Sequence, residues 1–372
     1  MTAIPVVYAF GNPYARGLAI GRALADPIRR SAAYNLAHFA RRGLDRGAME
    51  RLAGPLIEAT RRHLPDELAA LIGMANGAGL ALLDVLVPNA YEELDPHAAP
   101  GPWADHSGPI PPGPGQSVER CSALTVVAPG ITLLGHNEQW LANEPGDVVL
   151  IVEIPDDPAE PTVVSPTIAS WRPAVGITAA GHAQAVMSLT ARDDQPGIPR
   201  VFVSRASLAA GDPADALRRA TPDGRSGGYG YLHAFRGGRA CTVETTATRA
   251  VLADGPAVHA NHYLDVELAT IGAPPTAGSL ARYARLAELA AAAPATPTAI
   301  MAILADHGST PSTICLHPDS ADGDDAESVV FAMVCDVEAG RLWVAPGRPC
   351  EVPFEAFTVA DLLAGDAGGR LP

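Results

Sequence analysis

Basic residues are scarce in this chain of 372 residues. There are 26 Lys and Arg against 41 Asp and Glu, which gives a formal net charge of -15 at pH 7. No cluster of Lys or Arg is long enough to neutralise a row of phosphates. The sequence therefore excludes nucleic acid as a partner.

Long apolar runs are also missing. None reaches the roughly 18 residues that a membrane-spanning helix needs. The first five residues, Met-Thr-Ala-Ile-Pro, lack the basic start and the apolar stretch of a secretory signal. These absences predict a protein that works in the cytoplasm and has no membrane partner.

Cysteines are few and scattered. The five lie at positions 121, 241, 315, 335 and 350, without a C-x-x-C pair. An odd number at such spacing is typical neither of a disulfide framework nor of a zinc or redox motif. Most of them sit in apolar runs, where free cysteine is a small core residue, so the sequence predicts no metal and no cofactor. Cys121 differs because a loop precedes it.

Hydrophobic residues, by contrast, make up 48% of the chain, enough for one large or two medium domains. In the first hundred residues they recur every three or four positions, which predicts helices near residues 24–39, 65–75 and 82–86. From Asp95 to Gln116 the chain is rich in Pro and Gly, and this composition predicts an exposed loop.

The pattern changes to alternation at Cys121. It predicts a hairpin with a turn at Gly130 and a second strand from Ile131. Further strands are predicted at Val148 to Ile154, Thr162 to Ser165, Val175 to Thr178, Gln184 to Leu189, Ala240 to Glu244, Val329 to Cys335 and Leu342 to Val344, and helices at Val201 to Ala209, Pro213 to Ala220, Ser279 to Ala291 and Thr296 to Ala305. Because strands and helices come in blocks, the sequence indicates an α+β fold with antiparallel sheets covered by helices.

A loop that leads to a cysteine at the first position of a strand is what an N-terminal-nucleophile enzyme needs. The Cys121 thiol can attack the carbonyl of Arg120 and form a thioester, and water then releases a free α-amine on Cys121. This amine has a pKa of roughly 7.7 to 8.0 in model peptides, so it can act as general base for the thiol of its own residue.

Seven segments, in order, resemble the acyl-coenzyme A:6-aminopenicillanic acid acyltransferase family. They are Ala-Asn-Gly-Ala-Gly at 75–79, Cys-Ser-Ala-Leu-Thr-Val at 121–126, Leu-Leu-Gly-His-Asn-Glu-Gln-Trp at 133–140, Gly-Ile-Pro at 197–199, His-Ala-Asn-His-Tyr-Leu at 259–264, Ile-Cys-Leu-His-Pro at 314–318 and Ala-Pro-Gly-Arg-Pro-Cys at 345–350. The likeness covers nearly the whole chain, and penicillin V acylases and bile salt hydrolases are more distant relatives with the same fold.

The resemblance implies a four-layer αββα fold with two stacked antiparallel sheets. It also implies processing into an α chain of residues 1–120, which includes the exposed loop 95–119, and a β chain of residues 121–372, the two forming one unit. Cys121 matches the nucleophile, and Asn261 matches the asparagine whose amide helps to form the oxyanion hole. Asn137 and Gln139, in the matched segment 133–140, are further candidates for the site.

Three positions depart from the family pattern. Relatives usually have Gly where Arg120 stands, Asp where Gln139 stands and, in many members, Arg where Leu316 stands. Two charges expected near the nucleophile are therefore absent from these positions, which points to a different substrate. Gln139 is expected to lie close to the Cys121 α-amine and to hydrogen-bond it.

Several alternatives remain open from the sequence. The acyl group of the Cys121 thioester can pass to water, which gives hydrolysis, or to an amine, which gives transfer. An unprocessed, inactive binding protein of the same fold is a second hypothesis. A metal hydrolase that uses His259, His262 and Asp265 is a third. Gly-Gly-Tyr-Gly at 227–230 is interpreted as a turn rather than a phosphate-binding loop.

Overall fold

The computed structural model describes residues 3–95 and 121–367, so Arg120 and the predicted loop from residue 96 onward lie outside the described residues. The helices are α1 (Pro13–Ala23), α2 (Ala25–Arg41), α3 (Arg46–His63), α4 (Pro65–Ala78), α5 (Leu82–Asn89), α6 (Tyr91–Leu94), α7 (Arg200–Ser207), α8 (Pro213–Ala220), α9 (Val266–Ala269), α10 (Ala277–Ala292), α11 (Pro297–Leu304), the 3-10 helix η1 (Ser320–Asp325) and α12 (Val359–Ala367). Among these, no helix has both the length and the apolar character needed to cross a bilayer.

The strands form two sheets. The order in the first is β1 (Val6–Gly11), β4 (Val148–Pro155), β5 (Val163–Ile168), β6 (Gly176–Thr178), β7 (His182–Ser188), β8 (Tyr229–Phe235), β9 (Arg239–Thr245) and β10 (Ala250–Asp254). The order in the second is β11 (Val258–His259), β2 (Ser122–Ala128), β3 (Ile131–Leu141), β12 (Glu327–Asp336), β13 (Arg341–Ala345) and β14 (Glu355–Thr358). In the described residues β1 pairs with β4 in parallel, and the other neighbouring strands are antiparallel.

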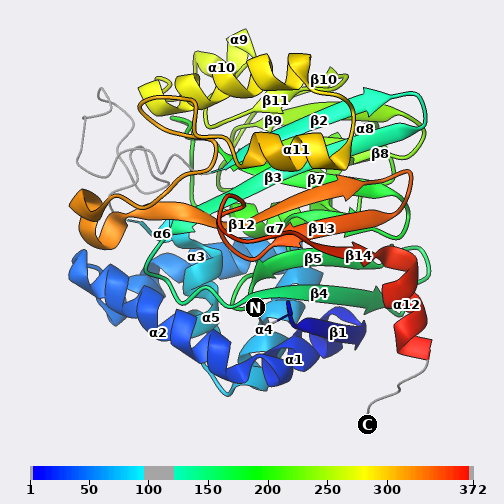
Figure 1. The fold of residues 1–372 in the computed structure, drawn as a ribbon. Coiled ribbons are helices and arrows are strands. Elements are labelled where there is room, and N and C mark those ends of the chain that lie inside the picture. Colours follow the sequence, from blue (N-terminus) through cyan, green and yellow to red (C-terminus); the bar gives the residue numbers. More distant parts are fainter. Residues whose placement is uncertain (1–2, 96–120, 368–372) are drawn as a thin grey trace.

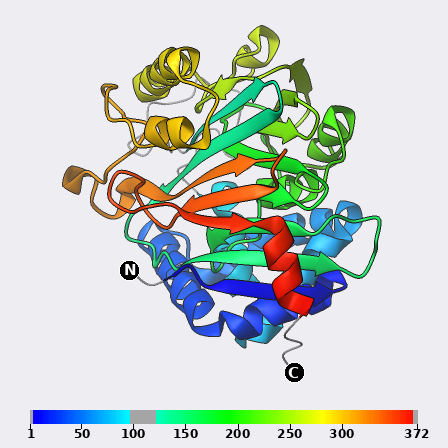
Figure 2. The same ribbon diagram turned by 45° about the vertical axis from the view of Figure 1, so that its right-hand side comes forward.

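Side-chain alternation along the strands produces the layers. In β4, Leu150 and Val152 pack between the sheets, whereas Val149 and Ile151 pack with the helices on the other side. Figure 1 shows the blue and cyan helices gathered around β1 and β4, and the yellow helices α10 and α11 beside β2 and β3. Figure 2 gives the same arrangement from the side. The predicted αββα architecture is confirmed.

Helices α10 and α11 cover the outer face of the six-stranded sheet. Leu286 on α10 and Ile300 on α11 pack in one cluster with Leu124 of β2 and Leu133 of β3, and all four side chains are fully buried. This packing matters for function because it brings α10 against the start of β2, directly after Cys121.

The interpretation of residues 227–230 as a turn is wrong, because Gly227 and Gly228 are not in a turn and β8 begins at Tyr229 and continues through Gly230. A Cβ on Gly230 would lie 2.8 Å from His259 Cε1, and one on Gly228 would lie 1.6 Å from the Thr245 carbonyl oxygen. These glycines are therefore required by close packing. Strand β1 and helix α3 were not predicted from the sequence.

Candidate active site

Cys121 lies directly before β2, in a backbone conformation that L-residues rarely adopt. Its φ is 81°, and among the described residues it alone of the non-glycine residues has a positive φ. Such a conformation costs about 1 to 3 kcal/mol and persists only where the surrounding structure imposes it. The residue is 3% exposed, so the strain is held inside the protein.

Arg282 of α10 holds both the backbone of Cys121 and the predicted oxyanion residue. Its Nη1 donates to the Cys121 carbonyl oxygen at 2.7 Å and to Ser122 Oγ at 2.9 Å, and its Nη2 donates to Asn261 Oδ1 at 2.7 Å. The side chain is fully buried. One guanidinium therefore joins two residues that are 140 positions apart in sequence, as their numbers show.

Asn261 follows β11 and is fixed on several sides. Its side-chain amide donates to the Ser188 carbonyl oxygen at 3.0 Å, and its backbone N–H donates to Ser279 Oγ at 2.8 Å. With Arg282 bonded to its Oδ1, the amide nitrogen has one orientation. A neutral donor held in this way suits a developing oxyanion, because it needs no reorganisation during the reaction.

The carboxylate at the Cys121 thiol belongs to Glu138. Cys121 Sγ donates to Glu138 Oε1 at 3.2 Å, and His136 Nε2 lies 3.1 Å from Glu138 Oε2. The hairpin register explains this contact: Ser122 pairs with Asn137, so Cys121 comes opposite Glu138. His136 and Glu138 point to the same face because strand side chains alternate.

The same alternation turns the predicted site residues Asn137 and Gln139 away from the thiol. Asn137 Nδ2 donates to the carbonyl oxygens of Leu304 at 2.8 Å and Ile314 at 2.9 Å, and Gln139 Nε2 donates to Ile314 at 3.2 Å. The expected contact between Gln139 and Cys121 is therefore wrong. Both amides attach β3 to the loop that follows α11.

Charged groups near Cys121 come from positions other than 139 and 316. Glu138 supplies a carboxylate at the thiol, and Arg282 supplies a cation at the Cys121 carbonyl. The carbonyl oxygen of Leu316 accepts from the N–H of Val329 at 3.1 Å. The sequence did not distinguish Arg282, because Arg285 on the same helix has similar neighbours and pairs instead with Glu288 and Asp306.

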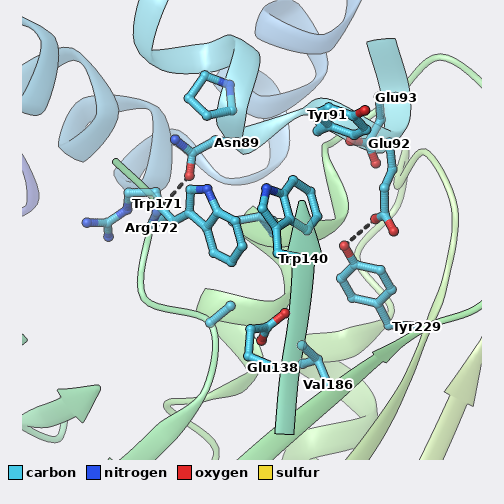
Figure 3. A pocket seen from close by; sticks show the side chains of 13 residues that line it. Asn89, Tyr91, Glu92, Glu93, Glu138, Trp140, Trp171, Arg172, Val186 and Tyr229 are labelled. Atoms are coloured by element: carbon cyan, nitrogen blue, oxygen red, sulfur yellow. Dashed lines mark hydrogen bonds between the residues drawn. The ribbon is translucent and has the colours of Figure 1, made fainter. Parts of the chain in front are cut away.

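Glu138 also forms part of the wall of a pocket. The pocket has a volume of about 60 Å³, and aromatic and apolar side chains form most of its wall: Pro88, Tyr91, Trp140, Trp171, Ala174, Val186, Val201 and Tyr229. Figure 3 shows Glu138 and Trp140 entering it from one strand, with Trp171 beside Trp140. The two indole rings meet edge to face at 4.6 Å between centroids. This mostly apolar lining with a few polar groups is typical of a small-molecule site.

Glu92 lies on the pocket wall together with Tyr229. It accepts a hydrogen bond from the hydroxyl of Tyr229 (Figure 3) and another from the hydroxyl of Ser188. Burial, reinforced by the Glu92 carboxylate, raises the pKa of Tyr229 well above its usual value of 10. The phenol therefore stays neutral and donates. Because the Ser188 carbonyl also holds Asn261, this wall is connected to the predicted oxyanion residue.

The residues of the metal-hydrolase hypothesis have separate partners. His259 Nε2 is 2.8 Å from Glu244 Oε1, and His262 Nδ1 is 2.8 Å from Ser279 Oγ. Asp265 caps α9 by accepting from two backbone N–H groups. These three side chains do not converge on a common point, so they do not form the site that this hypothesis needs.

Cys121, His136 and Glu138 have ligand atoms within 4.8 Å of one another, close enough to share a cation. The guanidinium of Arg282 on the Cys121 carbonyl opposes that use, because it already places a positive charge beside the thiol. A thiol next to a carboxylate, with a fixed amide nearby, instead suits acyl transfer.

The sequence profile of the acyl-coenzyme A:6-aminopenicillanic acid acyl-transferase family matches residues 127–351, more than half of the chain. The chain belongs to this family. The match begins within β2, six positions after Cys121, and covers Asn261 and Arg282.

Among solved structures, the chain is similar to penicillin V acylase from Agrobacterium tumefaciens, with 14% identity, a TM-score of 0.41 and coverage of 61% of this chain and 82% of the other. It is also similar to a mutant of conjugated bile acid hydrolase from Clostridium perfringens, with 11% identity, a TM-score of 0.40 and coverage of 65% and 93%. Likeness at this level says nothing about substrate. No curated protein matches the sequence.

Proposed function

We propose that this family member is a self-processing cysteine N-terminal-nucleophile enzyme, an acyltransferase or amide hydrolase that works through a thioester on Cys121. The observation that carries the proposal is the contact between the Cys121 thiol and Glu138, because Glu138 also lines the aromatic pocket. A nucleophile and a small-molecule site are thereby adjacent.

In the processing step, Cys121 Sγ attacks the carbonyl carbon of Arg120, and the thiol proton passes to Glu138. The Arg120 to Cys121 C–N bond breaks, the leaving nitrogen takes a proton, and a thioester remains. Water then hydrolyses the thioester to the Arg120 carboxylate and the free thiol. The positive φ of Cys121 supports this step, since strain in the substrate peptide is relieved when the bond breaks.

Turnover repeats the chemistry on a bound substrate. The released α-amine of Cys121 takes the thiol proton, Sγ attacks the acyl carbonyl carbon, and the amine or thiol leaving group departs with a proton. The Asn261 amide donates to the tetrahedral oxyanion. Water or a second amine then attacks the thioester, which gives the acid or a new amide.

The pocket supports an apolar acyl group as the part of the substrate that is recognised. Trp140, Trp171 and Tyr91 offer flat apolar surfaces, and Glu92 and Tyr229 offer a polar end. The acceptor is water or the amine of an amino acid, a β-lactam nucleus or another specialised metabolite. All five cysteines are free thiols, which fits work in the reducing cytoplasm.

After cleavage, residues 1–120 and 121–372 should stay together without a covalent link. Strand β1 of the first part pairs with β4 of the second along six residues. Arg172 also bonds Glu67 across the two parts at 3.0 Å, with both side chains buried. Breaking either contact would expose backbone groups or a buried charge.

The test is the intact mass and N-terminal sequence of purified protein. Wild type should give two chains, the larger beginning at Cys121, and Cys121→Ala should remain one chain with no turnover of N-acyl amides or acyl thioesters. Active enzyme without a Cys121 N-terminus would refute the proposal. A single wild-type chain without activity would favour the inactive binding protein.

A further inference from the structure

Two loops far from one another in sequence bring four metal-binding side chains together. The first loop joins α11 to η1 and carries His307, Cys315 and His317, and the second joins β13 to β14 and carries Cys350. The imidazole nitrogens and the sulfur atoms of the four all lie within 4.8 Å of one another. This cluster shares no member with the group at Cys121.

The separations within the cluster approach those of a tetrahedral zinc site. Zinc holds sulfur at about 2.3 Å and nitrogen at about 2.0 Å, so the tetrahedron edges are about 3.8 Å between sulfurs, about 3.5 Å between sulfur and nitrogen and about 3.3 Å between nitrogens. Here Cys315 Sγ and Cys350 Sγ are 3.5 Å apart, His317 Nε2 and Cys350 Sγ 3.2 Å, and the Nε2 atoms of His307 and His317 3.1 Å.

The surroundings orient the donors. The second ring nitrogen of His317, Nδ1, faces Glu351 Oε1 at 3.6 Å, and Arg348 fixes this carboxylate from its other side at 2.5 Å. A carboxylate behind the far nitrogen is the usual partner of a metal-bound imidazole. Cys315 is positioned by its backbone N–H, which donates to the Asp306 carbonyl at 3.0 Å.

We propose that His307, Cys315, His317 and Cys350 bind one Zn²⁺ as a structural site. Two thiolates and two imidazoles in a tetrahedral arrangement select zinc over the harder Mg²⁺ and Ca²⁺, and four protein ligands leave no open position for catalysis. The ion joins the 305–319 loop to the loop after β13. Asn137 and Gln139 donate to the carbonyl oxygen of Ile314, which precedes Cys315 in the chain. The zinc ion therefore also fixes the outer face of β3.

The first experiment measures metal content and binding with full-length protein kept reduced. After removal of metal with a chelator, titration with Zn²⁺ should saturate at one equivalent per chain. Cobalt(II) in its place should give the visible bands of a tetrahedral thiolate complex. The melting temperature of the wild type should fall on chelation and recover with Zn²⁺, since the ion binds the folded state.

Two of the proposed zinc ligands, His307 and Cys350, are exposed, so each can be replaced and compared with a control variant. Cys350→Ser and His307→Asn should each weaken zinc binding by about a hundredfold or more, a loss at least as large as that for removing an outer-sphere partner. Their melting temperatures should no longer respond to chelator. Controls are His63→Asn, a histidine on α3, and Cys121→Ala, which removes a ligand of the other cluster; both should retain the full equivalent of zinc.

Three results would overturn the proposal. The reduced wild type, with Cys315 and Cys350 as free thiols, could fail to bind zinc. Cys350→Ser and His307→Asn could bind as tightly as the wild type. Cys121→Ala could lose the ion, which would assign it to the nucleophile. None of these depends on whether the chain is an enzyme.

Discussion

The two faces of strand β3 carry different kinds of side chain. The inner face presents His136, Glu138 and Trp140, which meet the Cys121 thiol and the aromatic pocket. The outer face presents Asn137 and Gln139, which hold the loop after α11. Adjacent residues of one sequence motif therefore have different roles, and the alternation of side chains along the strand decides which face each residue occupies.

The contrast extends to charge. The inner face places a carboxylate at the thiol, where it can accept a proton. On the outer face Asn137 and Gln139 are neutral and fully buried, and their amides donate to buried backbone carbonyls. Changes on the inner face should therefore alter chemistry, and changes on the outer face should alter stability.

Replacement of Asn261, the predicted oxyanion residue, should have the largest effect on the chemistry. Asn261→Ala should lower kcat by roughly a hundredfold to a thousandfold, as for other single oxyanion donors, with a smaller change in KM. Steady-state kinetics on fully processed enzyme would measure it.

Asn137→Ala is the matched control, because it removes the same amide from the outer face of β3. It should reduce the free energy of unfolding by about 1 to 3 kcal/mol, since two backbone carbonyls lose a donor, and leave kcat of the folded enzyme nearly unchanged. Normal turnover in Asn261→Ala, with an intact fold, would place the oxyanion hole elsewhere.

Glu138→Gln should have the next largest effect. The amide keeps the size of the side chain but cannot take the thiol proton, so processing at Arg120 to Cys121 should slow by about a hundredfold. Turnover after processing should fall less, because the α-amine then acts as base. A time course of intact mass follows the cleavage. Processing at the wild-type rate would show that another group accepts the proton.

Most strands and helices were predicted from their periods, because these are local signals, whereas the four-layer arrangement was implied by the resemblance to the family. Cys121 was singled out by the change of loop into alternating strand and by the matched segments, and its role as nucleophile stays a prediction. Arg282 was missed because an arginine among alanines on a helix gives no sign that it faces inward. The zinc ligands were missed because their proximity depends on how two loops pack, which spacing in the chain does not encode.

The contact between Gln139 and the Cys121 α-amine was expected from the place of Gln139 in the family pattern, without regard to which face of the strand it occupies. The variant Gln139→Leu tests the corrected placement. Leucine removes the bond to the Ile314 carbonyl, which keeps its bond from Asn137 at 2.9 Å, so the free energy of unfolding should fall by only about 1 kcal/mol. If Gln139 contacted the Cys121 α-amine, losing that contact would shift the acidic limb of the rate profile, where the amine becomes protonated and stops acting as base. Because the side chain faces the other side of the sheet, we expect the acidic limb of kcat/KM to stay in place. A shifted acidic limb in a folded and processed variant would mean that β3 turns its other face to Cys121 after cleavage. The division of β3 into a chemical and a structural face would then hold only for the precursor.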